Sequence, residues 1–151
     1  MNKLSSILKS NVILNPTKEV ILNLICSCNY ITDKNAVFFK KFKITAPQYN
    51  VLRILRGQKL NPINLSQIQE RMVHKSSNAG RLVDKLVLKG LVVRSTCREN
   101  RRKIEIIITN KGLDLLELIE PELSNLENQN LSSLTDIEVL TLNSLLEKLR
   151  E

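Results

Sequence analysis

Tryptophan is absent from this chain of 151 residues, and aromatic residues make up only 3% of it. Because hydrophobic residues still reach 42%, the core must be built mainly from Leu, Ile and Val. A small helical protein with so few large aromatic side chains often completes its core against a partner subunit. The length itself is that of one domain of ordinary size, spanning residues 1–151.

Cysteine and histidine are scarce too. The three cysteines, Cys26, Cys28 and Cys97, are an odd number, and no signal peptide is recognisable, so a disulfide-stabilised secreted fold is not expected. His74 is the only histidine in the sequence, and it forms no recognised zinc-binding spacing with these cysteines. Paired catalytic carboxylates, a Gly-rich phosphate loop and a nucleophile motif are also missing. We therefore expect no enzyme, and neither a metal nor a cofactor.

Long apolar runs are missing as well. No stretch approaches the roughly 20 apolar residues that a membrane-spanning helix needs. The N-terminus also lacks the continuous apolar region of a signal peptide. We therefore expect a cytoplasmic protein that does not associate with a membrane.

Charge of one sign is in excess, and it is unevenly distributed along a chain of net charge +8. Residues 44–112 carry fourteen Lys and Arg against four Asp and Glu, whereas residues 113–151 carry two against nine. Residues 1–43 carry seven against two. An unevenly charged solvated surface is one explanation. The other is a basic module that faces a polyanion, followed by an acidic module that faces elsewhere.

Apolar residues recur at helical spacing through most of the chain, which predicts a mainly α fold. In the first helix, Ile21, Leu24, Ile25 and Cys28 share one side, so Cys28 is expected in the core. Pro121 is expected to interrupt and bend a later helix. The predicted helices lie near 17–42 with Thr17 as N-cap, from Thr45 to Gly57, from Asn64 or Ser66 onward, from Ser76 to Gly90, from Thr109 onward, and after a capping box at Thr135–Glu138.

A β-hairpin is predicted after Gly90. The stretch 91–93 is rich in β-branched residues, and Ile104, Ile106 and Ile108 show the period-2 spacing of a half-buried strand. A strongly basic loop separates the two strands. Two short helices, a turn and a hairpin with a basic loop make a small winged helix-turn-helix, which is a device for reading duplex DNA.

The helix predicted from Ser76 has one apolar face and one polar, basic face. On the polar face Arg81 can pair with guanine and Asn78 with adenine, while Ser76 and Ser77 can hold a phosphate at the helix N-terminus. An ordinary solvated face is the alternative, but the basic hairpin favours DNA, since its arginines can enter a minor groove. The predicted DNA-contacting residues are Lys75, Ser76, Ser77, Asn78, Arg81, Lys85, Arg98, Asn100, Arg101, Arg102 and Lys103.

Several motifs within residues 44–112 resemble the winged-helix domain of the MarR family of bacterial transcription regulators. The family shows a Leu-Thr-x-x-Gln helix start, an Arg-Leu-(Val)-Asp-(Lys/Arg)-Leu run, a Lys-Gly-Leu-Val-x-Arg exit, an Asp-x-Arg wing and a Leu-Thr-x-x-Gly motif. The similar segments here are Ile44–Gln48 (ITAPQ), Arg81–Leu86 (RLVDKL), Lys89–Arg94 (KGLVVR), Asn100–Arg102 (NRR) and Ile108–Gly112 (ITNKG).

Two residues depart from the family pattern. Asn100 stands where the wing usually has Asp, which by resemblance would orient Arg94 through an ion pair. Asn can donate and accept hydrogen bonds but supplies no charge. Gly80 lies inside the recognition helix, where glycine costs about 1 kcal/mol relative to Ala.

The resemblance implies a homodimeric transcription regulator, more often a repressor, that binds a pseudo-palindromic operator in double-stranded DNA. Residues 44–112 would form the DNA-binding lobe, and residues 1–43 and 113–151 the dimerisation helices. It also implies control by a small aromatic ligand bound between those helices and the lobe. Two alternatives remain open. One is a thiol-based redox sensor on the same fold, through Cys26 or Cys97, and the other is a winged-helix protein-interaction module without DNA binding.

Overall fold

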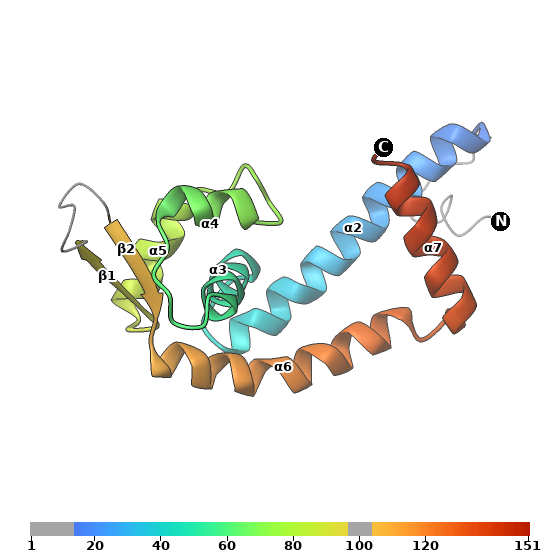
Figure 1. Ribbon diagram of the computed structural model, residues 1–151. Helices are drawn as coiled ribbons and strands as arrows, with labels where there is room; N and C mark the ends of the chain where they lie inside the picture. The colour runs from blue at the N-terminus through green and yellow to red at the C-terminus, as the bar shows by residue number, and fades with distance from the viewer. Residues whose placement is uncertain (1–13, 97–103) are drawn as a thin grey trace.

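The computed structural model describes residues 14–96 and 104–151. Within these residues the chain forms six helices and one two-stranded antiparallel sheet, which confirms the predicted mainly α winged helix-turn-helix. The elements in chain order are α2 (Pro16–Lys41), α3 (Ala46–Gly57), α4 (Leu65–Arg71), α5 (Ala79–Leu88), β1 (Val92–Thr96), β2 (Ile104–Ile108), α6 (Asn110–Leu131) and α7 (Asp136–Lys148). Figure 1 shows a lobe formed by α3, α4, α5 and the hairpin, from which α2 and α6 extend towards α7.

Side-chain caps determine where the helices begin. Thr45 starts α3 and Thr135 starts α7, each through a capping box, so both of these predictions are confirmed. The prediction for α2 was wrong by two residues. Its N-cap is Asn15, whose Oδ1 accepts a hydrogen bond from the amide of Lys18 at 2.8 Å. Asn is at least as good an N-cap as Thr17, so the earlier of two suitable residues starts the helix.

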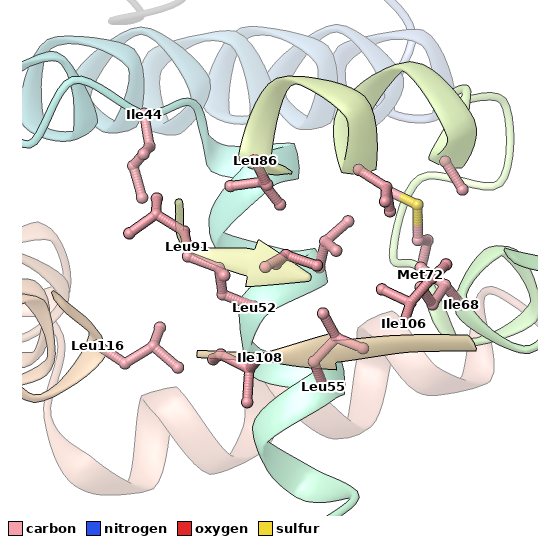
Figure 2. Close-up of a cluster of buried hydrophobic side chains, with 14 of the residues drawn as sticks. Ile44, Leu52, Leu55, Ile68, Met72, Leu86, Leu91, Ile106, Ile108 and Leu116 are labelled. Atoms are coloured by element: carbon pink, nitrogen blue, oxygen red, sulfur yellow. The ribbon is translucent and has the colours of Figure 1, made fainter. Parts of the chain in front are cut away.

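The core of the lobe surrounds α3, whose Leu52 and Leu55 are buried. Ile68, on α4, and Met72, the C-cap residue of α4, are buried in this core, as predicted. Burying a side chain of this size stabilises a fold by about 1.5–3 kcal/mol, so this cluster is the main source of the lobe's stability. Figure 2 shows side chains from the other elements converging on the same cluster, namely Ile44, Leu86, Leu91, Ile106, Ile108 and Leu116.

The hairpin is anchored in the core at its inner end. β1 and β2 pair from Val92 opposite Ile108 to Thr96 opposite Ile104. Ile106 and Ile108 are buried, as their alternation predicted, whereas Thr96 is exposed. Ile106 also exchanges backbone hydrogen bonds of 2.9 and 3.2 Å with Ile63, in the connection between α3 and α4. The strands therefore have a fixed position on the lobe.

The terminal helices leave much of their apolar surface uncovered. On α2, Ile21 and Ile25 are 47% and 52% exposed. Cys28 is exposed as well, so its predicted place in the core was wrong. The predicted apolar stripe exists, but periodicity identifies a shared face without identifying what covers it, and within this chain the stripe faces outward.

Pro121 does not interrupt α6, contrary to prediction. The helix continues from Asn110 to Leu131 with Pro121 inside it. The ring removes one backbone hydrogen bond, the one to the carbonyl of Glu117. Ile119 and Leu123 on either side are 0% and 8% exposed. Tertiary packing of this kind, more than local propensity, keeps a helix intact.

Candidate nucleic-acid interface

The turn between α4 and α5 is held by the side chain of Gln69. Its Nε2 donates to the backbone oxygen of Lys75 at 2.7 Å, and its Oε1 accepts from the amide of Ala79 at 3.1 Å. The amide of Val73 donates to Oδ1 of Asn50, on α3, at 3.0 Å. These bonds satisfy backbone groups at two helix ends that have no partner within their own helix. They therefore fix the direction in which α5 leaves the turn.

The start of α5 differs from the prediction. The helix begins at Ala79, and Asn78 is its N-cap, with Oδ1 accepting from the amide of Arg81 at 3.0 Å. Ser76 and Ser77 lie in the turn before the helix. Ser and Asn cap helices about equally well, so cap preference does not decide between them. The start at Asn78 is instead accompanied by the hydrogen bond from the amide of Ala79 to Oε1 of Gln69. A bidentate contact of Asn78 with adenine would require its Oδ1 to leave the cap.

α5 turns one side to the core and the other to solvent. Ala79, Val83 and Leu86 are at most 3% exposed. Arg81 and Lys85, four residues apart and therefore neighbours on one face, are exposed. Within the described part of the chain neither side chain forms a hydrogen bond or an ion pair. The solvent side of α5 thus presents two unpaired cations.

The other predicted contact residues lie around the turn or in the hairpin loop. Lys75 is exposed, and its ammonium donates to the backbone oxygen of Glu70 at the end of α4. Ser76 is exposed and Ser77 is half-buried. The predicted residues Arg98, Asn100, Arg101, Arg102 and Lys103 lie outside the described residues, as does Cys97.

Arg94 has a partner that was not predicted. Its Nη1 lies 2.8 Å from Oδ1 of Asp84, which connects β1 to α5. The resemblance implied that the residue at position 100 is the partner of Arg94. The sequence signal for the observed partner is the acidic residue of the RLVDKL segment, Asp84. The side chains of Arg94 and Asp84 are 33% and 59% exposed, and ion pairs this exposed are worth at most about 1 kcal/mol. The pair therefore acts mainly by orienting the hairpin against α5.

A groove of about 500 Å³ lies between α2 and the part of the lobe formed by α3 and α5. Lys89 donates from its ammonium to the backbone oxygen of Lys43 and lies 3.5 Å from Oε1 of the buried Gln48. The ionisable side chains that line the groove are all lysines, namely Lys40, Lys43, Lys85 and Lys89. Four ammonium groups around one open groove favour an anion.

Comparison with known proteins shows which family has this architecture. The sequence model of the MarR family matches residues 44–104. The HTH-type transcriptional regulator MgrA of Staphylococcus aureus is 32% identical over 112 residues, covering 73% of this chain and 72% of MgrA. A MarR transcription factor from Planctomyces limnophilus is 31% identical with a TM-score of 0.71, covering 90% of this chain and 98% of its own. This chain belongs to the MarR family.

As a MarR protein the chain is a winged-helix transcription regulator and not an enzyme, as the sequence predicted. Its α4 and α5 form the helix-turn-helix, with α5 as the recognition helix, and β1 and β2 are the strands of the wing. The fold is shared with Bordetella bronchiseptica BpsR, solved to explain how 6-hydroxynicotinic acid regulates its DNA binding. That structure has a TM-score of 0.79 at 20% identity and covers 93% of this chain and 99% of its own.

Two further findings concern the described residues alone. No helix among them is both long enough and apolar enough to cross a membrane. Of the cysteines in residues 14–96, Cys28 is exposed and Cys26 is half-buried, and neither forms a disulfide. The thiol-based alternative stays a prediction.

Proposed function

We propose that this MarR-family protein is a homodimeric repressor that binds a pseudo-palindromic operator in double-stranded DNA and is released from it by a small ligand. The observation that carries the proposal is the solvent side of α5, where Arg81 and Lys85 are exposed and have no partner among the described residues. Gln69 fixes the start of this helix, and the Asp84–Arg94 ion pair connects it to the wing. A rigid helix with free cations suits the major groove of DNA, which admits an α-helix.

The residues of the proposed DNA interface would have different roles. Arg81 would read guanine through a bidentate contact with O6 and N7. Asn78 would contribute by capping α5, because its Oδ1 is already committed to the amide of Arg81. The wing arginines and Asn100 would reach an adjacent minor groove. The remaining residues, Lys75, Ser76, Ser77, Lys85 and Lys103, would hold phosphates and set the register of the protein on DNA.

The homodimer would form through the terminal helices. On α7, Ile137 and Leu140 are 77% and 71% exposed, and Leu145 and the C-cap residue Leu149 are 59% exposed each. Large apolar side chains that are this exposed often mark a surface that binds another protein. A second copy that packs against α2 and α7 would bury these side chains and leave the basic lobes free to face DNA.

The ligand would be a small aromatic anion. The groove between α2 and the lobe offers lysine side chains for a carboxylate or phenolate, and Lys85 in its lining also lies on α5. An anion held there would draw the charge of Lys85 away from a phosphate. The affinity of the groove for this anion would also depend on the angle between α2 and the lobe. A ligand that has different affinities for two conformations shifts the equilibrium between them. The regulation of BpsR by 6-hydroxynicotinic acid supports a ligand of this class.

Selection of duplexes from a random pool by the purified protein tests the proposed DNA binding. We expect an inverted repeat whose half-sites lie about one helical turn apart, roughly 10 base pairs between centres. The affinity for the selected duplex should fall steeply with salt, by a slope of about −0.9 in log–log form for each phosphate contact. Weak, salt-insensitive association without an enriched sequence would instead favour the protein-interaction module.

Ligand control is tested separately, on the complex with the selected duplex. Aromatic carboxylates such as 6-hydroxynicotinate are titrated against their uncharged amides. The carboxylates should release DNA at lower concentrations, because only they carry the charge that the lysines attract. Equal release by the amides would contradict recognition through the lysine-lined groove.

A further inference from the structure

The helix α6 is attached to the DNA-binding lobe by an ionic contact with α3. Oε1 of Glu120 lies 2.5 Å from Nη2 of Arg56 and 3.5 Å from Nη1 of Arg53. The ion pair between Asp84 and Arg94, by contrast, lies inside the lobe and does not connect it to α6. The part of the chain beyond Glu120, residues 121–148, is called the arm below.

The contact is charged at neutral pH. The hydrogen bond from Arg56 is the main cause that lowers the pKa of Glu120 and raises the pKa of Arg56, and partial burial opposes both shifts. The side chains of Arg56 and Glu120 are about one-third exposed, at 33% and 35%. Two guanidinium groups therefore attract one carboxylate at a place that water only partly screens.

Glu120 lies where α6 leaves the lobe and where its backbone is weakest. Before it, Leu116 and Ile119 are fully buried, whereas within the described chain no residue of the arm beyond Leu123 is buried. Pro121 follows directly and lacks the N–H that would bond to the carbonyl of Glu117, so this turn is the easiest place for the helix to bend. The direction of the arm depends on the contacts made within this turn, together with the packing of Leu126 against the core and the hydrogen bond of 2.9 Å from the ammonium of Lys34 on α2 to Oδ1 of Asn130. Figure 1 shows how far α6 extends beyond the lobe, so a small change of angle here is amplified at α7.

We propose that Glu120 is a positioning residue that, through Arg56 and Arg53, fixes the angle between the lobe and the arm and thereby the spacing of the two α5 helices in the dimer. This inference rests on the proposed homodimer with two half-sites. The spacing between half-sites in DNA can be changed in known steps, because each added base pair moves a half-site by about 3.4 Å and rotates it by about 35°. If the angle between the lobe and the arm is fixed, the dimer should bind half-sites at one spacing. If the angle is variable, the dimer should bind half-sites at several spacings.

The test uses the selected operator with its central spacing lengthened or shortened by one and two base pairs, together with a duplex that holds a single half-site. The variants are Glu120→Gln, Arg56→Gln and the double variant. Glu122→Gln is the matched control, because it makes the same charge change two residues away at an exposed position. Affinities and melting temperatures are measured for each protein.

We expect wild type and Glu122→Gln to prefer one spacing equally strongly. In Glu120→Gln the ratio of affinities for the best and the adjacent spacings should fall about two- to fivefold, the factor that one partly exposed ion pair can supply. Affinity for the single half-site should stay unchanged, because α5 is untouched. The double variant should resemble Glu120→Gln, since that change alone removes the carboxylate that both arginines contact, whereas Arg56→Gln leaves the contact with Arg53 and should have a smaller effect.

An unchanged spacing profile in Glu120→Gln would overturn the inference, and a lowered melting temperature beside it would show that the pair only stabilises the fold. A wild-type protein that binds one half-site as tightly as the full operator would overturn the proposed two-half-site function, and the inference with it. The two failures are distinguished by the wild-type profile alone.

Discussion

At the scale of single residues, the charged side chains of α5 have separate roles. Asp84 is committed to Arg94 at 2.8 Å, so it serves the structure of the lobe. Arg81, three residues earlier, is exposed and unpaired within the described chain. A side chain without an internal partner loses no internal contact when it binds DNA, which makes Arg81 the residue best placed to read a base.

Arg81→Ala should therefore relax sequence discrimination. The loss of a bidentate base contact is worth about 1–3 kcal/mol between the right and the wrong base. Competition binding with selected and scrambled duplexes measures this as the ratio of the two affinities. Arg71→Ala is the control, because the guanidinium of Arg71 already donates to the carbonyl of Gln67 at 2.8 Å. If the ratio falls equally in both variants, Arg81 does not read a base.

Gly112, near the start of α6, is required by packing. A Cβ there would lie 2.4 Å from the backbone oxygen of Leu91 and 2.7 Å from Cγ1 of Ile108. Gly112→Ala should destabilise the fold by about 1–3 kcal/mol, as overpacking of a core does. Gly57→Ala is the matched control, since nothing lies within 4 Å of a Cβ at Gly57, and it should be neutral or slightly stabilising. Urea denaturation compares the two, and equal stabilities would contradict the packing argument.

At the scale of elements, the sequence predicted each helix and strand and most of the buried faces, because these depend on periodicity and local caps. Thr45 and the Ile104–Ile108 alternation are confirmed in this way. The orientation of α5 could not be predicted, because it depends on single hydrogen bonds between residues that carry no periodic signal. Gln69 is the main example, and its bond to Ala79 joins positions ten residues apart. The burial of the α2 stripe could not be predicted either, since it requires knowing what lies opposite.

Gln69→Ala should loosen the junction between α4 and α5. It removes two hydrogen bonds, each worth about 0.5–1.5 kcal/mol. The amide of Ala79 loses its acceptor, so its hydrogen exchange should accelerate more than that of amides in the middle of α3. Gln58→Ala, which removes one long side-chain bond of 3.4 Å to Ile54, is the control. Unchanged exchange at Ala79 would show that the turn does not need Gln69.

At the scale of the whole molecule, the net charge changes sign between the lobe and the C-terminal helices. The segment 44–112 is strongly basic, whereas 113–151 is acidic and carries the exposed leucines of α7. The uneven charge could be read from the sequence. The structure adds that several apolar side chains of α2 and α7 remain exposed to solvent in a single chain. A molecule arranged in this way can join to a second copy at one end and approach DNA with the other.

Leu145→Glu should therefore produce a monomer of 17.3 kDa where the wild type sediments at twice that mass. The side chain of Leu145 is 59% exposed, and a carboxylate in a buried interface carries a large desolvation penalty. Asn143→Glu places the same charge on the side of α7 that carries Asp136 and Glu147, and it should leave the dimer intact. Analytical ultracentrifugation measures both variants, and a wild-type monomer at micromolar concentration would exclude the dimer.

Hydroxyl-radical footprinting of the protein on its selected duplex tests most directly whether α5 and the wing of a symmetric dimer read DNA. The expected pattern is two equivalent protected segments, related by a twofold axis and centred about one helical turn apart. The same pattern should weaken over both segments together in Leu145→Glu, because each lobe alone makes half of the contacts. A single protected segment without symmetry, or no protection at a concentration that saturates binding, would contradict the account.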